Sequence, residues 1–229
     1  NKKIWNYLKI FFRQSLITVK RGKIRALLSI LSILIGVASV ISMLAIGNGA
    51  QKSIEKEFES LGTNVLVLQN GIGIATNAKT APPKLNLEDG LFLKESITDI
   101  VDTSPVVYGT RQVTYKNKNF KTIITGTDIS YERIRNARPI YGRFFTSLEN
   151  EQRMRVAILG QTVYKNLFKG ENPVGETIKI DKVLFKVIGI LPEKGSDGSK
   201  DRDDVILIPV NTAMHRLIGQ NYVDFFDIE

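Results

Sequence analysis

Residues 170–177, with the sequence GENPVGET, have the glycine spacing of a phosphate-binding loop. In such a loop a lysine follows the second glycine and neutralises phosphate charge, whereas this chain has Glu176 at that position. A carboxylate there repels phosphate, and the segment follows a predicted helix instead of a strand. We therefore interpret it as a turn before a strand at 176–180, and we expect no nucleotide to bind there.

Two glycines after another predicted strand are typical of the start of a dinucleotide-binding turn. Gly71 and Gly73 follow the apolar run at 65–69. The third glycine of that fingerprint is missing, and Pro82-Pro83 prevents the long helix that would have to follow. We therefore interpret residues 70–86 as a loop without a bound dinucleotide.

Oxygen-bearing side chains alternate near the end of the chain in the manner of calcium ligands, at Asp197, Ser199, Asp201 and Asp203. The glycine and the twelfth-position glutamate of an EF-hand loop are Arg202 and Ile208 here, so a solvated loop is the better interpretation. His215, the single histidine, is expected to be structural, and the chain has no cysteine. We predict no catalytic, cofactor-binding or metal-binding residue in this chain.

The net charge of +9 comes almost entirely from the first 25 residues. That segment holds eight basic residues and no acidic one, which leaves 24 basic against 23 acidic residues for the other positions. Nucleic-acid binding needs a basic face on the folded part of a protein, so we expect no nucleic-acid partner. With 43% hydrophobic and 24% charged residues, the chain is also too apolar to be disordered throughout.

The apolar run at 26–46 follows this basic segment directly and lies in a stretch without charge. As a helix it would span about 31 Å, close to the hydrocarbon thickness of a bilayer, and lipid leaves the backbone no other hydrogen-bonded form. A cleaved signal peptide has a shorter apolar run. A buried core helix would be interrupted by polar residues. We therefore predict a transmembrane helix at 26–46.

The two flanks of this predicted span differ in charge. Residues 1–25 are strongly positive, whereas residues 47–62 carry two lysines against three glutamates. The positive-inside rule then places the N-terminus in the cytoplasm. We expect the chain to lie in the bacterial cell membrane, with residues 47–229 as an extracytoplasmic domain.

Residues 2–19 have the pattern of an amphipathic helix, with apolar side chains at spacings of three and four and cations on the other face. A helix of this kind lies in the interface of the cytoplasmic leaflet. We expect residues 1–25 to form such a cytoplasmic interfacial helix, which turns into the spanning helix near Arg21-Gly22. The predicted membrane-interface residues are Ile4, Trp5, Leu8, Phe11, Phe12 and Arg13.

The predicted spanning helix carries a stripe of small residues, namely Ser29, Ser32, Gly36 and Ser39. Small side chains let helices approach closely in lipid, so this stripe predicts a packing face against other transmembrane helices. Serine and glycine are also common in such helices without any packing role, and the sequence leaves both interpretations open.

The region after the span alternates short predicted strands and helices, which makes the fold α+β. Gly47–Gly49 is expected to loosen the exit of the spanning helix. Thr146 and Glu149 form a capping-box pattern, and Asn86 is a predicted helix N-cap. The predicted strands are 65–69, 106–115, 119–126, 155–160, 176–180, 183–191 and 205–209. The predicted helices are 50–60, 87–96, a short one after Thr146, 161–168, and one capped by Asn211 or Thr212 that runs to Ile218.

Two stretches resemble a known family. Residues 25–64 read RALLSILSILIGVASVISMLAIGNGAQKSIEKEFESLGTN, and residues 142–191 contain GRFF, VAILGQTV, NPVG and VIGIL. These motifs resemble the permeases of MacB-like ABC transporters. The resemblance implies four transmembrane helices with a large outer domain, in two parts called Porter and Sabre, between the first and the second. It implies that this chain is an amino-terminal portion, with a Sabre-like insertion at approximately 110–208.

The resemblance also implies a function. A MacB-like permease couples ATP hydrolysis in the cytoplasm to movement of its outer domain, for export of peptides, antibiotics or lipoproteins. ATP and magnesium would then bind a partner ATPase subunit or domain, so the chain itself is not expected to be an enzyme. Further expected partners are a second permease copy, a membrane-fusion adaptor protein and the lipid bilayer. Two alternatives stay open: an FtsX-like mechanical regulator of cell-wall hydrolases, and a single-span extracytoplasmic sensor.

Overall fold

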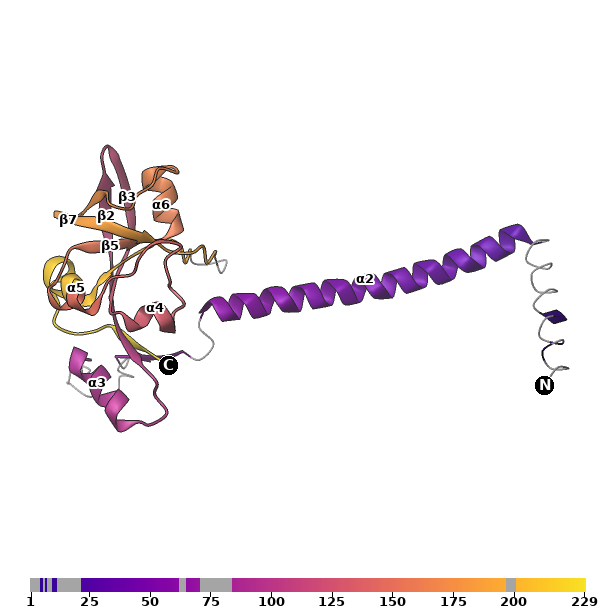
Figure 1. Cartoon of the computed structure of the whole chain (residues 1–229), viewed down its shortest axis with the longest axis horizontal. Helices are drawn as coiled ribbons and strands as arrows, with labels where there is room; N and C mark the ends of the chain where they lie inside the picture. The colour runs from indigo at the N-terminus through magenta and orange to yellow at the C-terminus, as the bar shows by residue number, and fades with distance from the viewer. Residues whose placement is uncertain are drawn as a thin grey trace, which may run out of the picture. The chain divides into compact units, whose positions relative to one another are not determined.

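The computed structural model describes residues 22–61, 65–70, 84–196 and 201–229, together with Trp5, Tyr7, Ile10 and Phe11; for 55–61 it describes the backbone only. The chain divides into two compact units, Asn1–Glu57 and Phe58–Glu229. The second unit is a mixed α/β domain (Figure 1). Its helical elements are α3 (Leu87–Ser96), α4 (Ser130–Ile134), α5 (Ser147–Glu151), α6 (Gln161–Phe168), α7 (Val210–Thr212) and the π-helix η1 (Ala213–Ile218).

Helix α2, Lys23–Leu61, is a single helix of 39 residues (Figure 1). The expected loosening at Gly47–Gly49 is wrong, because the helix continues through these residues, and the separate helix expected at 50–60 is part of α2. A glycine inside a helix costs only about 1 kcal/mol relative to alanine. The Gln, Lys and Glu residues that follow favour helix, so the two glycines do not end it.

Nine strands of the described region form the sheet: β1 (Leu66–Gln69), β2 (Thr103–Tyr115), β3 (Lys118–Thr127), β4 (Tyr141–Gly142), β5 (Val156–Leu159), β6 (Thr177–Ile180), β7 (Val183–Ile190), β8 (Val205–Pro209) and β9 (Phe225–Ile228). Their order is β1-β9-β2-β3-β8-β5-β7-β4, and β6 pairs with both β2 and β7. Strands β2, β3, β8, β5, β7 and β6 therefore close into a ring.

The largest apolar cluster lies where the strands of this ring and helix α6 meet. Its fully buried members include Val113, Ile124, Leu159, Leu167 and Phe185. The ring forms because the strand sequences place apolar residues at every second position where one side is covered. The hairpin of β2 and β3 confirms the predicted turn, and the predicted strands from 155 to 209 are confirmed with small shifts at their ends.

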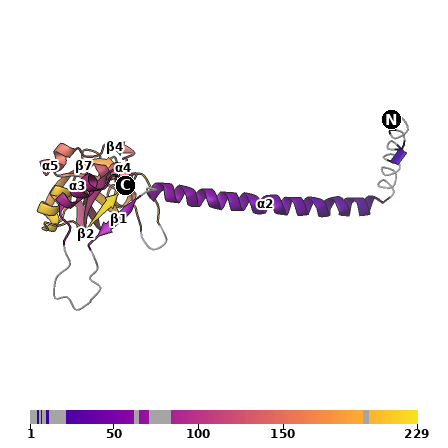
Figure 2. The ribbon, with the colours of Figure 1, turned by 90° about the horizontal axis from the view of Figure 1, so that it is seen from below.

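Strands β9 and β1 extend the sheet beyond the ring. Strand β9 pairs with the first residues of β2, and β1 pairs with the other side of β9 (Figure 2). The sequence predicts β1 as a buried strand, but its residues are exposed, Leu66 by 72%. The reason is that β1 is the last strand at this edge, so its side chains lack the cover that central strands have. The sequence pattern did not predict β9.

Helix starts follow the predicted capping chemistry at two of three places. Asn86 and Thr146 each head a capping box, with Asp89 and Glu149 as the acidic partners, so both predictions are confirmed. The helix expected after Asn211 or Thr212 begins instead at Val210, with Pro209 in the N-cap position.

The side chain of Thr212 is not available for capping. Its hydroxyl donates to the backbone carbonyl of Met154 at 2.9 Å, and the residue is fully buried inside the helical segment. Pro209 is the last residue of β8 and has extended ψ, so the helix begins directly where this strand ends. The segment then continues as the π-helix η1 to Ile218.

Candidate functional site

Helix α2 has the length and composition of a membrane-spanning segment. The candidate span is Lys23–Ile54, with a mean hydropathy of 2.5 in its most apolar window, none of which is buried. Apolar side chains are exposed around the helix, for example Leu27 by 65% and Ile41 by 60%. At 1.5 Å per residue the whole of α2 is about 58 Å long, roughly twice the hydrocarbon thickness.

The serine hydroxyls of the small-residue stripe on α2 are hydrogen-bonded within the helix itself. The hydroxyls of Ser29, Ser32 and Ser39 donate to the backbone carbonyls four residues earlier, at 3.0, 2.9 and 2.8 Å. A side chain added at Gly36 would meet no atom within 4 Å. Since the serines satisfy their own hydrogen bonds, another helix could pack on this stripe without a polar partner of its own. The packing role itself stays a prediction.

Only part of the predicted interfacial helix lies within the described residues. Trp5 and Phe11 have helical backbone and exposed side chains, at 71% and 70%, as do Tyr7 and Ile10. Ile4, Leu8, Phe12 and Arg13 lie outside the described residues.

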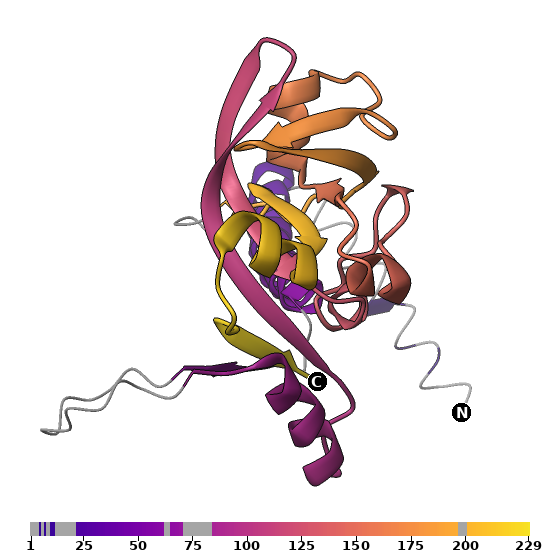
Figure 3. The same cartoon turned by 90° about the vertical axis from the view of Figure 1, so that its left-hand side faces the viewer.

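Strand β2 joins two parts of the second unit. Its first four residues, Thr103–Val106, pair with β9, and Val107–Tyr115 pair with β3. Figure 3 shows the β2–β3 hairpin running from the end that carries α3 to the opposite end of the domain. We call the place where β2 changes partner, together with α4 and β9, the joint.

Ion pairs from α4 and the residue after it hold this joint together. Arg135 donates from Nε to Asp227 Oδ2 at 2.7 Å and from a second nitrogen to Asp227 Oδ1. The Asp227 side chain is fully buried. Arg133 pairs with both Asp102 and Glu229, at 3.0 and 3.2 Å. Arg135, directly after α4, is thereby tied to β9, and Arg133 on α4 is tied to the residues just before β2 and just after β9.

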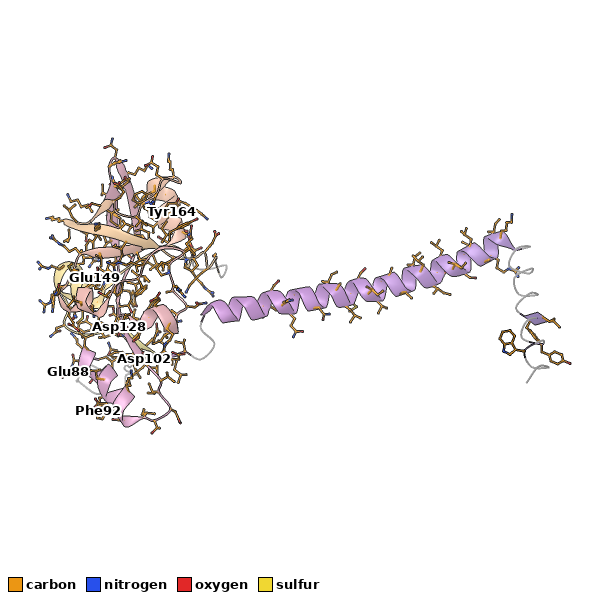
Figure 4. The ribbon with its side chains drawn as sticks, viewed as in Figure 1. Glu88, Phe92, Asp102, Asp128, Glu149 and Tyr164 are labelled. Carbon is orange, nitrogen blue, oxygen red and sulfur yellow. The ribbon has the colours of Figure 1, made fainter. Side chains whose placement is uncertain are left out.

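A hydroxyl–carboxyl contact adds to the joint. Ser104 Oγ donates to Asp128 Oδ1 at 2.6 Å and lies 2.9 Å from Thr127 Oγ1. Burial raises the pKa of Asp128 to about 6; the Ser104 hydrogen bond lowers it and the nearby charge of Asp102 raises it (Figure 4). The joint therefore contains a carboxyl group that takes up a proton near neutral pH.

Asp128 predicts a pH dependence of stability. The folded protein holds this proton up to about pH 6, whereas the unfolded chain loses it near 3.8, so folding is less favourable as pH rises through this window. We expect the free energy of unfolding to fall by about 2 kcal/mol between pH 4.5 and 6.5, and Asp128→Asn to remove this slope. Urea unfolding followed by circular dichroism at several pH values measures it.

The chosen window separates Asp128 from the other shifted acids of the domain. The Arg143 hydrogen bond lowers the pKa of Glu149 to about 2, and hydrogen bonds from Lys94 and others lower the pKa of Asp102 against the effect of burial. Both groups contribute stability that is lost only at lower pH. An unchanged slope in Asp128→Asn would show that another group is responsible.

The family model of the MacB-like periplasmic core domain matches residues 26–229. The chain belongs to this family. The match confirms the resemblance seen in the two motif-bearing stretches, and the mixed α/β fold after an N-terminal apolar helix is the fold expected from it. A MacB-like permease domain with such a helix is a membrane protein.

Relatives with MacB-like sequences are longer than this chain. A macrolide export ATP-binding/permease protein MacB from Bdellovibrio bacteriovorus is 49% identical over 215 residues, which cover 93% of this chain and 33% of the relative. The protein of the same name from Chlorobaculum tepidum is 41% identical over 223 residues, covering 96% and 34%. The chain thus spans about one third of the curated relatives it matches.

A solved MacB structure has the same fold as the second unit of this chain. The periplasmic region of MacB from Actinobacillus actinomycetemcomitans aligns with a TM-score of 0.62 at 22% identity, covering 75% of this chain and 77% of that one. At this identity the likeness concerns the fold alone. It supports a MacB-like fold for this domain.

The tempting motifs of the sequence have structural uses in this MacB-like domain. Gly170 and Gly175 both have positive φ in the turn between α6 and β6, and Glu176 accepts a hydrogen bond from the Tyr115 hydroxyl at 3.0 Å. His215 is exposed on η1. Asp203 is buried and accepts backbone N–H groups of its own loop. Asp197 and Ser199 lie outside the described residues.

The joint was missed by sequence reasoning. Arg135 and Asp227 are 92 positions apart, and neither belongs to a periodic pattern or a short motif. The one local sign of a buried charge is Asp227 itself, which lies within the apolar strand sequence FFDI. A charge within an apolar run predicts a partner of opposite charge, but the run does not identify that partner.

Proposed function

We propose that this chain is the part of a MacB-like exporter that carries movement from a cytoplasmic ATPase to the domain outside the membrane. The observation that carries the proposal is the continuity of α2. One helix runs without a break through the predicted span at 26–46 and on to Leu61, so its last residues, from Phe58, already belong to the second unit. A helix transmits displacement along its axis because every turn is hydrogen-bonded to the next.

The joint in the domain that follows α2 supports the same proposal. Its ion pairs tie α4 to β9, so a displacement that enters the β1–β9 edge is passed to the ring instead of being absorbed. The ATP and magnesium that power the movement would bind the partner ATPase. In this proposal the N-terminus is cytoplasmic, residues 1–25 lie on the inner leaflet, residues 47–229 are extracytoplasmic, and the Sabre-like part occupies approximately 110–208.

The proposed partners follow from the exporter role. The small-residue stripe on α2 would pack against a second permease copy or another transmembrane helix. The outer domain would bind a membrane-fusion adaptor. The exported class would be peptides, antibiotics or lipoproteins. An FtsX-like regulator would use the same mechanics, and loss of export against loss of cell division after deletion separates the two.

Breaking α2 after the predicted span at 26–46 tests the transmission. Ala50→Pro removes the hydrogen bond to the carbonyl four residues earlier, at the last residue of that predicted span, and costs about 3 kcal/mol of local helix stability. In the complete transporter we expect export to fall about tenfold or more while ATP hydrolysis continues. Ala50→Leu keeps the helix and should export normally. Full export by the proline variant would refute the transmission.

The control for correct insertion uses the absence of cysteine from this chain. Single cysteines at Lys118→Cys and Lys23→Cys are labelled with a membrane-impermeant maleimide, each with and without Ala50→Pro. In intact spheroplasts the first should be labelled and the second protected until the membrane is opened. The reverse pattern would overturn the proposed orientation, independently of the export result.

A further inference from the structure

A cleft of about 720 Å³ lies on one face of the sheet, over β1, β9, β2, β3 and β8. Its floor is built from side chains that point to the same side of neighbouring strands, among them Val67, Val106, Tyr108, Thr110, Ile123 and Phe225. Tyr108 is 55% exposed, and its ring centre lies 5.9 Å from that of Phe225. The floor is thus an accessible apolar and aromatic surface.

Lys194 forms part of the wall of this cleft and lacks a carboxylate partner. Its Nζ donates to the backbone carbonyl of Arg135 at 2.6 Å. It takes part in none of the ion pairs found within 4.0 Å among the described residues. Burial lowers the pKa of Lys194 to about 8; the positive charges of Arg135 and Arg202 lower it further, and Asp203 raises it.

The backbone of the loop that carries Lys194 is held by hydrogen bonds to the side chain of Asp203. The buried Asp203 accepts the backbone N–H of Lys194 at 2.8 Å and that of Gly195 at 3.0 Å. Hydrogen bonds therefore position both the backbone of Lys194 and, through the Arg135 carbonyl, its ammonium group at the cleft. Such a pre-positioned cation, which has no ion pair within 4.0 Å among the described residues, can form a charge-assisted hydrogen bond with an anion.

The acidic residues of the cleft already have hydrogen-bond donors, with one exception. Asp227 is paired with Arg135, Asp224 accepts the Tyr108 N–H at 2.9 Å, and Asp201 accepts the Asp203 N–H at 2.8 Å. The exception is Asp204, whose Oδ1 is buried and has no hydrogen-bond partner. Asp204 lines the cleft, and a rotation of its side chain would bring this carboxylate to an N–H or O–H of a bound molecule, which satisfies the unpaired acceptor.

We propose that this cleft binds an amphipathic carboxylate that also carries an amide or hydroxyl group. Its apolar part lies on the Tyr108–Phe225 floor, its carboxylate meets Lys194, and its amide or hydroxyl donates to Asp204. Acylated amino acids and the carboxyl end of a short apolar peptide share this chemistry.

The test compares two probes that differ only in charge, hexanoylglycine and its neutral amide, hexanoylglycinamide. Binding to the full chain in lipid nanodiscs is measured by titration calorimetry, with empty nanodiscs subtracted. We expect the amide to bind about tenfold more weakly or worse, which is what the loss of one charge-assisted hydrogen bond costs. A short apolar peptide with a free carboxyl end, tested beside hexanoylglycine, shows which source binds tighter.

Variants assign the binding to the cleft. Lys194→Met should lose affinity as the amide probe does, Tyr108→Ser should weaken both probes, and Lys179→Met, an exposed lysine on β6 away from the cleft, should change nothing. Lys194→Arg keeps the charge and should bind hexanoylglycine. Raising the pH from 7 to 9 should weaken binding to the wild type, since Lys194 loses its proton, but not to Lys194→Arg.

Three results would overturn the proposal: no binding of hexanoylglycine, equal binding of the two probes, or tighter binding of hexylamine than of hexanoylglycine. The last result would assign the cleft to a cation held by Asp204. If Lys194→Met fails to fold, the pH comparison between the wild type and Lys194→Arg still decides. None of these readouts depends on export, so the exporter proposal can fail without this one.

Discussion

Replacing Asp227 by alanine is expected to destabilise the α/β domain by about 3–5 kcal/mol, the usual cost of removing one partner from a buried ion pair. The Asp227 side chain is fully buried and Arg135 is three-quarters buried, so the guanidinium would be left in the interior without its counter-charge. Lys194, whose ammonium bonds the Arg135 carbonyl, would add a second positive charge nearby. Urea unfolding of the full chain, followed by circular dichroism, measures the loss.

Two control variants separate the buried pair from charge effects in general. Glu193→Ala removes the partner of Lys165 in an exposed pair and should leave stability near that of the wild type. Arg135→Met with Asp227→Leu removes both charges and should recover much of the loss, because no unpaired charge remains. If Asp227→Ala were as stable as Glu193→Ala, the joint would not be held by this pair.

Phe185→Ala should have an effect of similar size, about 3–5 kcal/mol, for a different reason. Phe185 lies on β7 with no exposed surface, in the apolar cluster within the ring of strands. Its removal leaves a cavity that the surrounding strands cannot fill, because their positions are fixed by hydrogen bonds to both neighbours. The same unfolding experiment applies.

The neighbouring Leu184 provides a matched control on the same strand. Its side chain points to the opposite face and is 55% exposed. Leu184→Ala removes an apolar side chain of comparable chemistry and should change the unfolding free energy by only about 0.5 kcal/mol. Equal losses in the two variants would mean that this strand is not oriented as described.

Local features of the fold could be predicted from the sequence. The hairpin of β2 and β3, helix α6 and the capping boxes at Asn86 and Thr146 depend on residues a few positions apart, and their patterns are complete in the chain. The apolar helix could be predicted from composition alone, because few structures other than a membrane span need so many uncharged residues in a row.

The joint and the cleft could not be predicted in this way. Both depend on which strands become neighbours, and strand β9, four residues long, gives too little pattern to place it beside β2. Lys194 reaches Arg135 only because Asp203 folds its loop back, through bonds that no spacing rule describes. The loosening expected at Gly47–Gly49 is wrong for the opposite reason. It rests on the low helix propensity of glycine alone, and the helix-favouring residues on both sides outweigh that propensity.

Because β2 takes part in both portions of the sheet, the two portions cannot slide past each other along it. A slip of one residue would invert the faces of β2 against β3, exposing the buried Val107 and burying the exposed Tyr108. A slip of two residues would break all the pairs with β9 and β3 together. Strand β2 therefore fixes the register of the β1–β9 extension against the ring, and the two portions of the sheet keep one common alignment.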